Sequence, residues 1–386
     1  MRHFDHLDQQ TRTRLFEREP DQADLTSASE VGAWMGAALY LPGNRASAAA
    51  DIMRQRRSGT LSVVLDFEDA LPDTDVATTT TVVRELLETL DASGEPLPMV
   101  FIRMRGPADI AEVGGALGRE SRIITGFIFA KFDPFADGAS YLEQIGLISE
   151  RFGRAVFGMP IIESSTFAHR ETRVDGLLAL KHQLSGETSI AGLRIGGTDL
   201  ASAFGLRRTA ETTVYDIQVV SDAISDIVNI LGRADGSALA ISAPVWEHFA
   251  PRDRVMKPQL RSTPFESRDA VAFREQLVRS GLDTLIREIN LDKLNGLSGK
   301  TVIHPSHVGL VHAMSVVSGE EFDDALAIID KERVGGAWGS PSRNKMNEVR
   351  PHLGWARQVL LRARVFGVAR NGIDFIDFLL ALQDAQ

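Results

Sequence analysis

The chain has 386 residues, of which 44% are hydrophobic and 24% charged, enough to build one large hydrophobic core. Its formal net charge of −10 argues against a nucleic-acid-binding surface, and the absence of cysteine excludes disulfides, thiolate metal sites and cysteine nucleophiles. Residues 1–22 are polar and lack the apolar core of a signal peptide. No apolar stretch approaches the roughly 20 residues of a membrane span, so we expect a cytoplasmic protein without membrane contact.

Eight apolar runs of strand length recur along the chain, and most are separated by segments long enough for a helix. The runs are ALYLP (38–42), LSVVLDFED (61–69), PMVFIRMR (98–105), GFIFAKF (126–132), AVFGMPIIE (155–163), GLRIGGTD (192–199), SALAISAP (237–244) and GKTVIHP (299–305). Near-continuous apolar strands that alternate with helices indicate a parallel sheet covered on both faces. Eight such units predict an α/β fold of the (β/α)8 TIM-barrel type. An open dinucleotide-binding sheet is the competing interpretation, but no G-x-G-x-x-G follows an early strand.

Two regions lie outside the eight units. Residues 1–30 are polar and charged, and we expect an N-terminal extension that packs on the outside or is partly mobile. Residues 31–315 are predicted to form the TIM-barrel domain. Residues 316–386 are predicted to form a C-terminal helical extension, because they contain a helical stretch, a turn-rich linker and two further amphipathic stretches.

Charged residues gather at the carboxyl end of nearly every predicted strand. All strands of a parallel barrel open onto one face, where active sites are built, so these side chains are expected to share one pocket. Burying them separately would be costly, because an unpaired charge loses its hydration. In chain order they are Arg45, Asp66, Glu68, Asp69, Arg103, Arg105, Lys131, Glu163, Asp199 and His304.

Glu163 and Asp199 form the strongest pair among these residues. One strand–helix–strand unit separates them, so they are expected on neighbouring strands. Two carboxylates with open water positions suit Mg²⁺, or Mn²⁺ as the alternative, better than zinc, which prefers histidine and cysteine ligands. Asp199 has a second interpretation as the cap of the helix that begins LASAFGL.

The order of the motifs YLPGNR, VVLDFEDA, VFIRMR, PIIES, GGTDL and GKTVIHP resembles the citrate lyase β-subunit-like group of the HpcH/HpaI aldolase family. This group includes malyl-CoA and citramalyl-CoA lyases, and the similarity covers about residues 37–315. It implies a Mg²⁺-dependent barrel enzyme that makes or breaks a carbon–carbon bond next to a carbonyl. It also implies homotrimers or homohexamers, and a small carboxylic acid or a CoA thioester as substrate.

The resemblance implies roles for individual residues. Glu163 and Asp199 match the metal ligands, and Arg103 matches the arginine that holds the substrate carboxylate or carbonyl. Arg45 matches a residue at the entrance for the acyl carrier group. Lys131 matches the lysine of a Pro-Lys pair, with alanine here in place of proline, and its contact with substrate or with an acid of the second strand both stay open.

The acidic motif after the second strand matches the family's D-x-E-D-A. Asp66, Glu68 and Asp69 would lie behind the metal and its waters, where they fix those waters and orient Arg103. Cleavage releases an enolate, and Arg103 supplies a permanently charged, bidentate partner for its oxygen. We therefore predict catalytic roles for Arg103, Glu68 and Asp69, and substrate contacts for Arg45, Arg103, Asp66 and Lys131.

The histidines give no clear general base. His304 has two interpretations, as a proton-transfer group near neutral pH or as a residue that fixes the loop before Pro305. His307 and His312 are expected on the surface or in loops. In relatives an acid from a neighbouring subunit can complete the site, and Asp323 or Asp324 are the candidates here.

This chain departs from its relatives on the carrier side of the pocket. It has Gly36 and Ala37 where relatives carry Arg-Ser, and its seventh strand is expected to end in SAP, leaving Ser242 where relatives often show Asp-Gly. A thioester and a free acid therefore both stay open as substrates. Two other functions remain as alternatives: a citrate-lyase-like subunit that needs a partner or acyl carrier, and a barrel that binds a ligand without catalysis.

Overall fold

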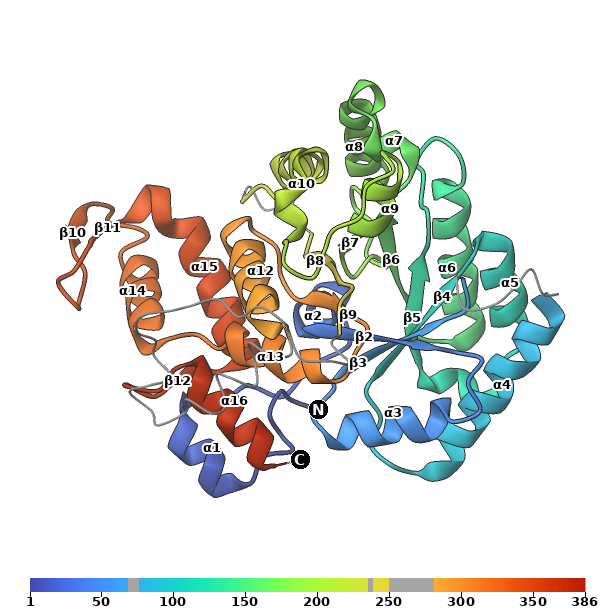
Figure 1. Ribbon diagram of the computed structural model, residues 1–386, viewed down its shortest axis with the longest axis horizontal. Helices are drawn as coiled ribbons and strands as arrows, with labels where there is room; N and C mark the ends of the chain where they lie inside the picture. The colour runs from blue at the N-terminus through green and yellow to red at the C-terminus, as the bar shows by residue number, and fades with distance from the viewer. Residues whose placement is uncertain (69–75, 235–238, 250–280, 386) are drawn as a thin grey trace.

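The computed structural model describes residues 1–68, 76–234, 239–249 and 281–385. At its centre eight parallel strands form a closed barrel in chain order, which confirms the predicted TIM-barrel fold (Figure 1). Pairing of the first and last of these strands closes the barrel. The strands are β2 (Ala37–Pro42), β3 (Ser62–Asp66), β4 (Met99–Met104), β5 (Ile124–Phe129), β6 (Phe157–Ile162), β7 (Leu193–Ile195), β8 (Ile241–Trp246) and β9 (Lys300–Val302).

Helices surround the barrel and connect its strands (Figure 1). They are α3 (Ala48–Arg57), α4 (Val76–Ser93), α5 (Pro107–Ala116), η1 (Arg119–Ile123), α6 (Gly138–Phe152), α7 (Ser165–Ala168), α8 (Arg170–Gln183), α9 (Gly197–Ser202), η2 (Val214–Asp216), α10 (Gln218–Leu231), α12 (Leu282–Leu294) and α13 (Ser306–Ser315). The connection that contains α9 brings this short helix directly onto the carboxyl end of β7.

The alternation of side chains along each strand divides the core into an inner and an outer part. Residues of one parity, such as Val64, Phe101 and Met159, form a cluster inside the barrel. Residues of the other parity, such as Leu65 and Ile102, pack outward in a cluster with the surrounding helices. Near-continuous apolar runs are required because both faces of each strand are buried.

Helix α2 (Ala28–Trp34) precedes the first barrel strand and contributes Val31 and Trp34 to the inner cluster. The same cluster contains Met99 and Phe157, which begin β4 and β6. This helix therefore packs against the amino ends of the strands, and the opposite, carboxyl end carries the polar residues.

The two ends of the described chain pack together beside the barrel (Figure 1). After α1 (Gln9–Leu15), strand β1 (Phe16–Arg18) pairs antiparallel with β12 (Val368–Ala369). Phe4 is 1% exposed, and the rings of Phe16 and Phe378 lie 4.9 Å apart. The N-terminal segment thus contributes to the hydrophobic core, while the domain boundary at residue 30 stays a prediction.

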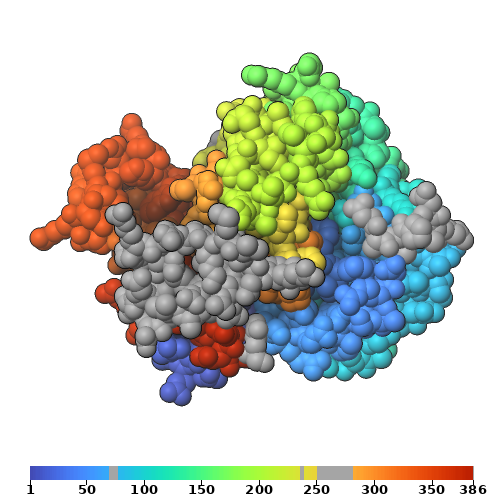
Figure 2. Space-filling view, in the orientation of Figure 1, coloured from blue at the N-terminus to red at the C-terminus, as the bar shows by residue number. Residues whose placement is uncertain are grey.

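The C-terminal residues form a lobe on one side of the barrel (Figure 2). It comprises α14 (Gly319–Asp330), the antiparallel pair β10 (Ala337–Gly339) and β11 (Met346–Glu348), and α15 (Val349–Phe366), followed by α16 (Phe375–Asp384) nearer the barrel. Val317, Ile328, Ala356 and Val359 give α14 and α15 a hydrophobic cluster of their own. None of the helices in the described ranges is apolar over a length that would cross a membrane.

Candidate active site

The predicted acidic and basic residues lie at the carboxyl ends of adjacent strands. Asp66 is the last residue of β3 and is in register with Arg103 on β4. Glu163 follows β6 directly, and Asp199 lies in the first turn of α9, immediately after β7. Asp66, Arg103 and Glu163 share the parity of the inner cluster, so all three point into the mouth of the barrel.

Arg103 is held by two carboxylates. Its Nε and Nη2 donate to Oδ1 and Oδ2 of Asp66 at 2.9 and 2.7 Å, and its Nη1 lies 2.7 Å from Oε2 of Glu68. Burial by itself lowers the pKa of Arg103, but the hydrogen bonds and charges of these acids raise it above its ordinary value. The guanidinium is therefore permanently charged and fixed in one orientation.

Glu163 is a buried carboxyl group with a perturbed acidity. Burial, and after it the negative charge of Asp199, raise the pKa of Glu163 from an ordinary 4.5 to about 8, against the opposing effects of the Lys131 N–H and Arg103. The side chain of Glu163 is 6% exposed, and Asp199 is half-buried. The chain has thus placed two acids close enough together that one negative charge disfavours the other.

The backbone around Glu163 is shaped to hold this carboxylate. The N–H of Lys131 donates to Oε1 of Glu163 at 2.8 Å, and Lys131 has a positive φ of 49°, a conformation uncommon for a residue with a side chain. Gly196 lies against the other oxygen, because a Cβ added there would be 2.2 Å from Oε2. Position 196 therefore requires glycine, because the carboxylate of Glu163 approaches its backbone too closely for a side chain.

Glu163 and Asp199 fit a hard divalent cation. In the described part of the chain, neither carboxylate forms a salt bridge with a lysine, arginine or histidine. Two buried or half-buried acids without a cationic partner are costly unless a cation joins them. Those residues contain no cluster of three or more candidate ligands, so water or substrate would complete the shell, as is usual for Mg²⁺.

Two other predicted site residues differ in how closely they approach this centre. Nζ of Lys131 lies 2.9 Å from Oε1 of Glu68, which is the pairing with a second-strand acid left open by the sequence. Arg45 lies in the loop after β2 with 56% of its side chain exposed, and its guanidinium lies 3.8 Å from the carboxylate of Asp51.

Asp69 lies outside the described residues. Asp199 is not the N-cap of α9, a position occupied by Gly196. The catalytic and binding roles of these residues stay predictions.

The expectation for two histidines was wrong. His307 and His312 are 0% and 4% exposed on α13, not on the surface or in loops. His312 accepts a hydrogen bond from the N–H of Ala37 at 3.2 Å, and burial lowers the pKa of both rings to about 3. Helix α13, which follows the eighth strand, packs the face that carries His307 and His312 against the core. Both histidines are neutral structural residues.

His304 is partly exposed and lies two residues before that helix, which begins at Ser306. Its Nδ1 lies 2.8 Å from Oγ of Ser306 and accepts the N–H of Ser306 at 3.3 Å. These contacts fix the turn around Pro305. Asp324, one of the acids considered for a neighbouring site, is fully buried and bonded to Asn347 and Lys345 within its own C-terminal lobe.

A buried charge network beside the site was not recognised in the sequence. Glu288 on α12 lies 2.6 Å from Arg208 and 2.8 Å from Lys300, and Lys300 also lies 2.7 Å from Asp292. Although burial alone raises the pKa of Glu288, Lys300 and Arg208 hold it below its ordinary value. The signal was present as two acids four residues apart, facing a lysine that begins a buried strand.

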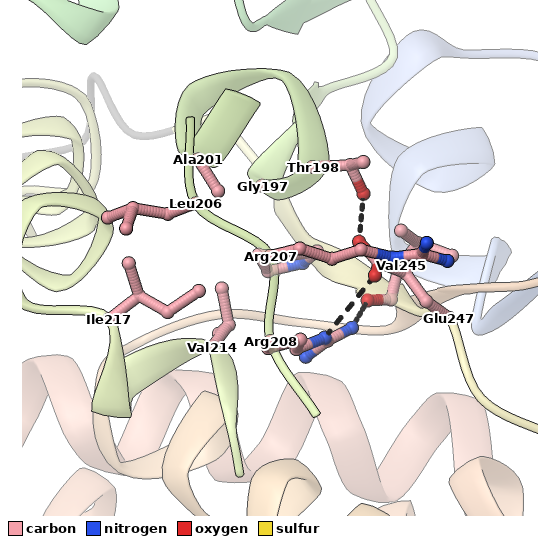
Figure 3. A pocket seen from close by; sticks show the side chains of 11 residues that line it. Gly197, Thr198, Ala201, Leu206, Arg207, Arg208, Val214, Ile217, Val245 and Glu247 are labelled. Carbon is pink, nitrogen blue, oxygen red and sulfur yellow. Dashed lines mark hydrogen bonds and ion pairs between the residues drawn. The ribbon is translucent and has the colours of Figure 1, made fainter. Parts of the chain in front are cut away.

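This network reaches the helix that carries Asp199. Arg208 also donates to the carbonyl of Val245, and Glu247, after β8, accepts from the hydroxyl of Thr198 on α9 (Figure 3). Thr198, Arg208 and Glu247 line a shallow pocket next to α9. The network therefore fixes the position of α9, and through it that of Asp199.

The seventh barrel strand continues further than the sequence indicated. β8 runs to Trp246, so SAP does not end it, and Ser242 is 4% exposed within the strand. Its in-register neighbour on β7 is Arg194, which is 1% exposed. Arg194 lies within the predicted apolar run GLRIGGTD (192–199). Arg194 has the same strand parity as Gly192 and Gly196, and this parity faces the barrel interior. A charged residue at such a position is the signal that would have identified a charge inside the barrel.

The closed barrel and the acids and arginine at its carboxyl face define a TIM-barrel enzyme. The sequence profile of a family described as "C-C_Bond_Lyase of the TIM-Barrel fold" matches residues 30–368. The chain belongs to this family and is a carbon–carbon lyase, which confirms the resemblance found in the sequence. No curated protein sequence is significantly similar to the chain.

Several solved structures are similar to this chain at low sequence identity. A citrate lyase from Burkholderia xenovorans is 16% identical, with a TM-score of 0.60, over 90% of this chain and 95% of that one. The CitE protein of Mycobacterium tuberculosis, in complex with magnesium, acetoacetate and coenzyme A, is 16% identical with a TM-score of 0.46, over 86% of this chain and 99% of that one. A Haloferax volcanii malate synthase in a pyruvate and acetyl-CoA complex is 12% identical with a TM-score of 0.48, over 84% and 90%.

Proposed function

We propose that this protein is a Mg²⁺-dependent lyase, with Mn²⁺ as the alternative ion. It would cleave a carbon–carbon bond by a retro-aldol or retro-Claisen reaction. The substrate would be a hydroxy-acyl-CoA thioester or a small hydroxy or keto acid. The supporting observation is the pair of Glu163 and Asp199, two neighbouring acids at the barrel mouth without a basic partner among the described residues. Membership in a carbon–carbon lyase family supports the reaction class.

Each residue has a role that its surroundings support. Glu163 and Asp199 would hold the cation, which when bound polarises a carbonyl and orients the acid that chelates it. Arg103 is close enough to Glu163 to lower its pKa, and Asp66 and Glu68 keep its guanidinium in place. Such a fixed positive group stabilises the negative charge that develops on an enolate oxygen, because no reorganisation is needed during the reaction.

The central test is substitution of the two proposed ligands. Glu163→Gln and Asp199→Asn preserve shape but remove the charges, so each should abolish Mg²⁺ binding and lower turnover by at least about a hundredfold. The control is Glu187→Gln, because Glu187 is exposed outside the site. Turnover would be measured by release of the carbonyl product from malyl-CoA, citramalyl-CoA and the corresponding free acids, with and without EDTA. Unchanged turnover in both site variants would refute the proposal.

The thioester and the free acid can be distinguished through Arg45. This side chain is mostly exposed and outside the Arg103 cluster, which suits a contact with an acyl carrier group at the entrance. If a CoA thioester is the substrate, Arg45→Ala should raise KM for the thioester and leave kcat unchanged. An equal effect on the free acid would exclude the carrier contact.

We further propose a cytoplasmic homotrimer or homohexamer, which the family resemblance implies. Light scattering coupled to gel filtration measures the mass of the assembly directly. A monomer of 42.2 kDa at micromolar concentration would contradict this part of the proposal.

A further inference from the structure

Arg194 is a buried cation inside the barrel that the proposed mechanism does not use. Its position on β7 is in register with Ile161 on β6, a residue of the inner cluster. It is 1% exposed, and its Nη2 donates to the hydroxyl of Thr301 on β9. Its Nε and Nη1 are buried and make no hydrogen bond with any described residue.

A second buried polar group without a partner lies beside it. Ser242 is the register neighbour of Arg194 on β8, and its Oγ is also buried without a hydrogen-bond partner among the described residues. Outward residues Ile241 and Ala243 flank it, so its side chain points inward like that of Arg194. Two strands therefore direct three unsatisfied polar atoms at the same part of the barrel interior.

The two arginines near this point differ in how their charges are balanced. The guanidinium carbons of Arg103 and Arg194 both lie 5.3 Å from the centre of the Tyr40 ring. Arg103 has Asp66 and Glu68 as ionic partners. Within the described ranges Arg194 has no carboxylate partner, and a ring face compensates a buried charge only in part.

Arg194 also lies close to the proposed metal ligands. It is two residues before Gly196, whose Cα lies against the carboxylate of Glu163. Two residues of a strand span roughly 6.6 Å, which is comparable with the length of a four-carbon acid. A small acid bound at Glu163 and Asp199 could therefore reach the guanidinium with its other end.

We propose that Arg194 and Ser242 form an anion subsite that receives the second carboxylate of a dicarboxylic substrate, whose hydroxy-acid end chelates the metal. This inference rests on the proposed function and narrows its substrate class. A carboxylate would accept from Nε and Nη1 of Arg194 and from the hydroxyl of Ser242, which satisfies all three buried groups. Water would satisfy the hydrogen bonds but leave the buried positive charge without a counter-charge.

The test compares two acids that differ only at the far end. Malate and 2-hydroxybutanoate share the chelating hydroxy-acid group, but malate carries a carboxylate where the other has a methyl group. In calorimetric titrations of the full chain with Mg²⁺, the wild type should bind malate at least about tenfold more tightly. Arg194→Met should remove this preference without weakening 2-hydroxybutanoate, and Ser242→Ala should reduce it.

The control variant is Arg350→Met, because Arg350 is exposed on α15, and it should keep the preference for malate. Equal affinities of the wild type for both acids, or an unchanged preference in Arg194→Met, would overturn the subsite while Mg²⁺-dependent binding of 2-hydroxybutanoate still supports the metal site. Binding that does not depend on Mg²⁺ would contradict the proposed function itself, and the subsite proposal, which rests on that function, would be refuted as well.

A further titration separates the substrate carboxylate from a free anion. If the subsite binds the second carboxylate, inorganic phosphate should compete with malate and leave 2-hydroxybutanoate unaffected. If phosphate instead strengthens 2-hydroxybutanoate binding and malate has no advantage, the subsite holds a free anion and the dicarboxylate assignment is wrong.

Discussion

Glu163 makes the stability of the metal-free protein depend on pH in a direction that can be calculated. The pKa of Glu163 is about 8 in the folded protein against an ordinary 4.5, so the folded state binds this proton more tightly than the unfolded state. Its contribution to stability is complete below pH 4.5 and is lost as the pH rises through about 8. At about 1.4 kcal/mol for each pKa unit, the whole loss amounts to roughly 5 kcal/mol.

Glu163→Gln should remove this dependence. Glutamine stays neutral at every pH and can still accept from the N–H of Lys131 through its amide oxygen. The variant should therefore match the wild type near pH 4.5 and exceed it by several kcal/mol at pH 8.5, both in EDTA. The difference between the two proteins reports Glu163 together with its interaction with Asp199, and the contributions of distant titrating groups cancel.

The assay is urea unfolding, followed by circular dichroism at several pH values between 4.5 and 8.5. Addition of Mg²⁺ at pH 8.5 should stabilise the wild type and leave Glu163→Gln unchanged, since a ligand stabilises only the state that binds it. A stability difference that stays constant across this pH range would refute the reasoning, because it would show that Glu163 has similar acidity in both states.

Three further predictions concern residues that support the site or the fold. Gly196→Ala places a methyl group against Glu163 and should weaken Mg²⁺ binding by at least about tenfold in calorimetry, whereas Gly115→Ala, in open space on α5, should not. Glu288→Gln leaves buried cations without their counter-charge and should lower the free energy of unfolding by about 3–5 kcal/mol; a loss below 1 kcal/mol would show that the network is not needed for stability. Phe4→Ala should cost about 3–5 kcal/mol in denaturant unfolding, because Phe4 is buried in the core, and a neutral result would mean that the N-terminal segment packs only loosely.

The candidate site was predictable where chemistry follows directly from strand order. Glu163 and Asp199 each come at the end of an apolar run, and parallel strands bring their carboxyl ends to one face. The same reasoning placed Asp66 and Arg103 at this face, and the structure adds that they are in register and bonded. These inferences need only the sequence spacing and the handedness of strand–helix–strand units.

Other features depended on contacts between distant segments, which sequence spacing does not determine. His307 and His312 were placed wrongly, because a polar side chain on a helix does not show which face the fold will bury. Lys131 had two possible partners, and only the folded barrel, in which β4 alone separates β3 from β5, brings its ammonium group to Glu68. The network of Arg208, Glu288 and Lys300 joins residues 80 and 12 positions apart in the chain.

The sequence by itself determined the barrel and the face on which its acids gather. Eight apolar runs with intervening helices have few ways to bury both faces of every strand, and closure into a barrel is the one that leaves no exposed edge. Only the tertiary structure decided how the charges at this face are balanced. Arg103 is paired with its acids, Glu163 and Asp199 repel each other without a basic partner among the described residues, and Arg194 has no counter-charge there. Sequence spacing does not show this, because side-chain direction inside a closed barrel depends on all eight strands together.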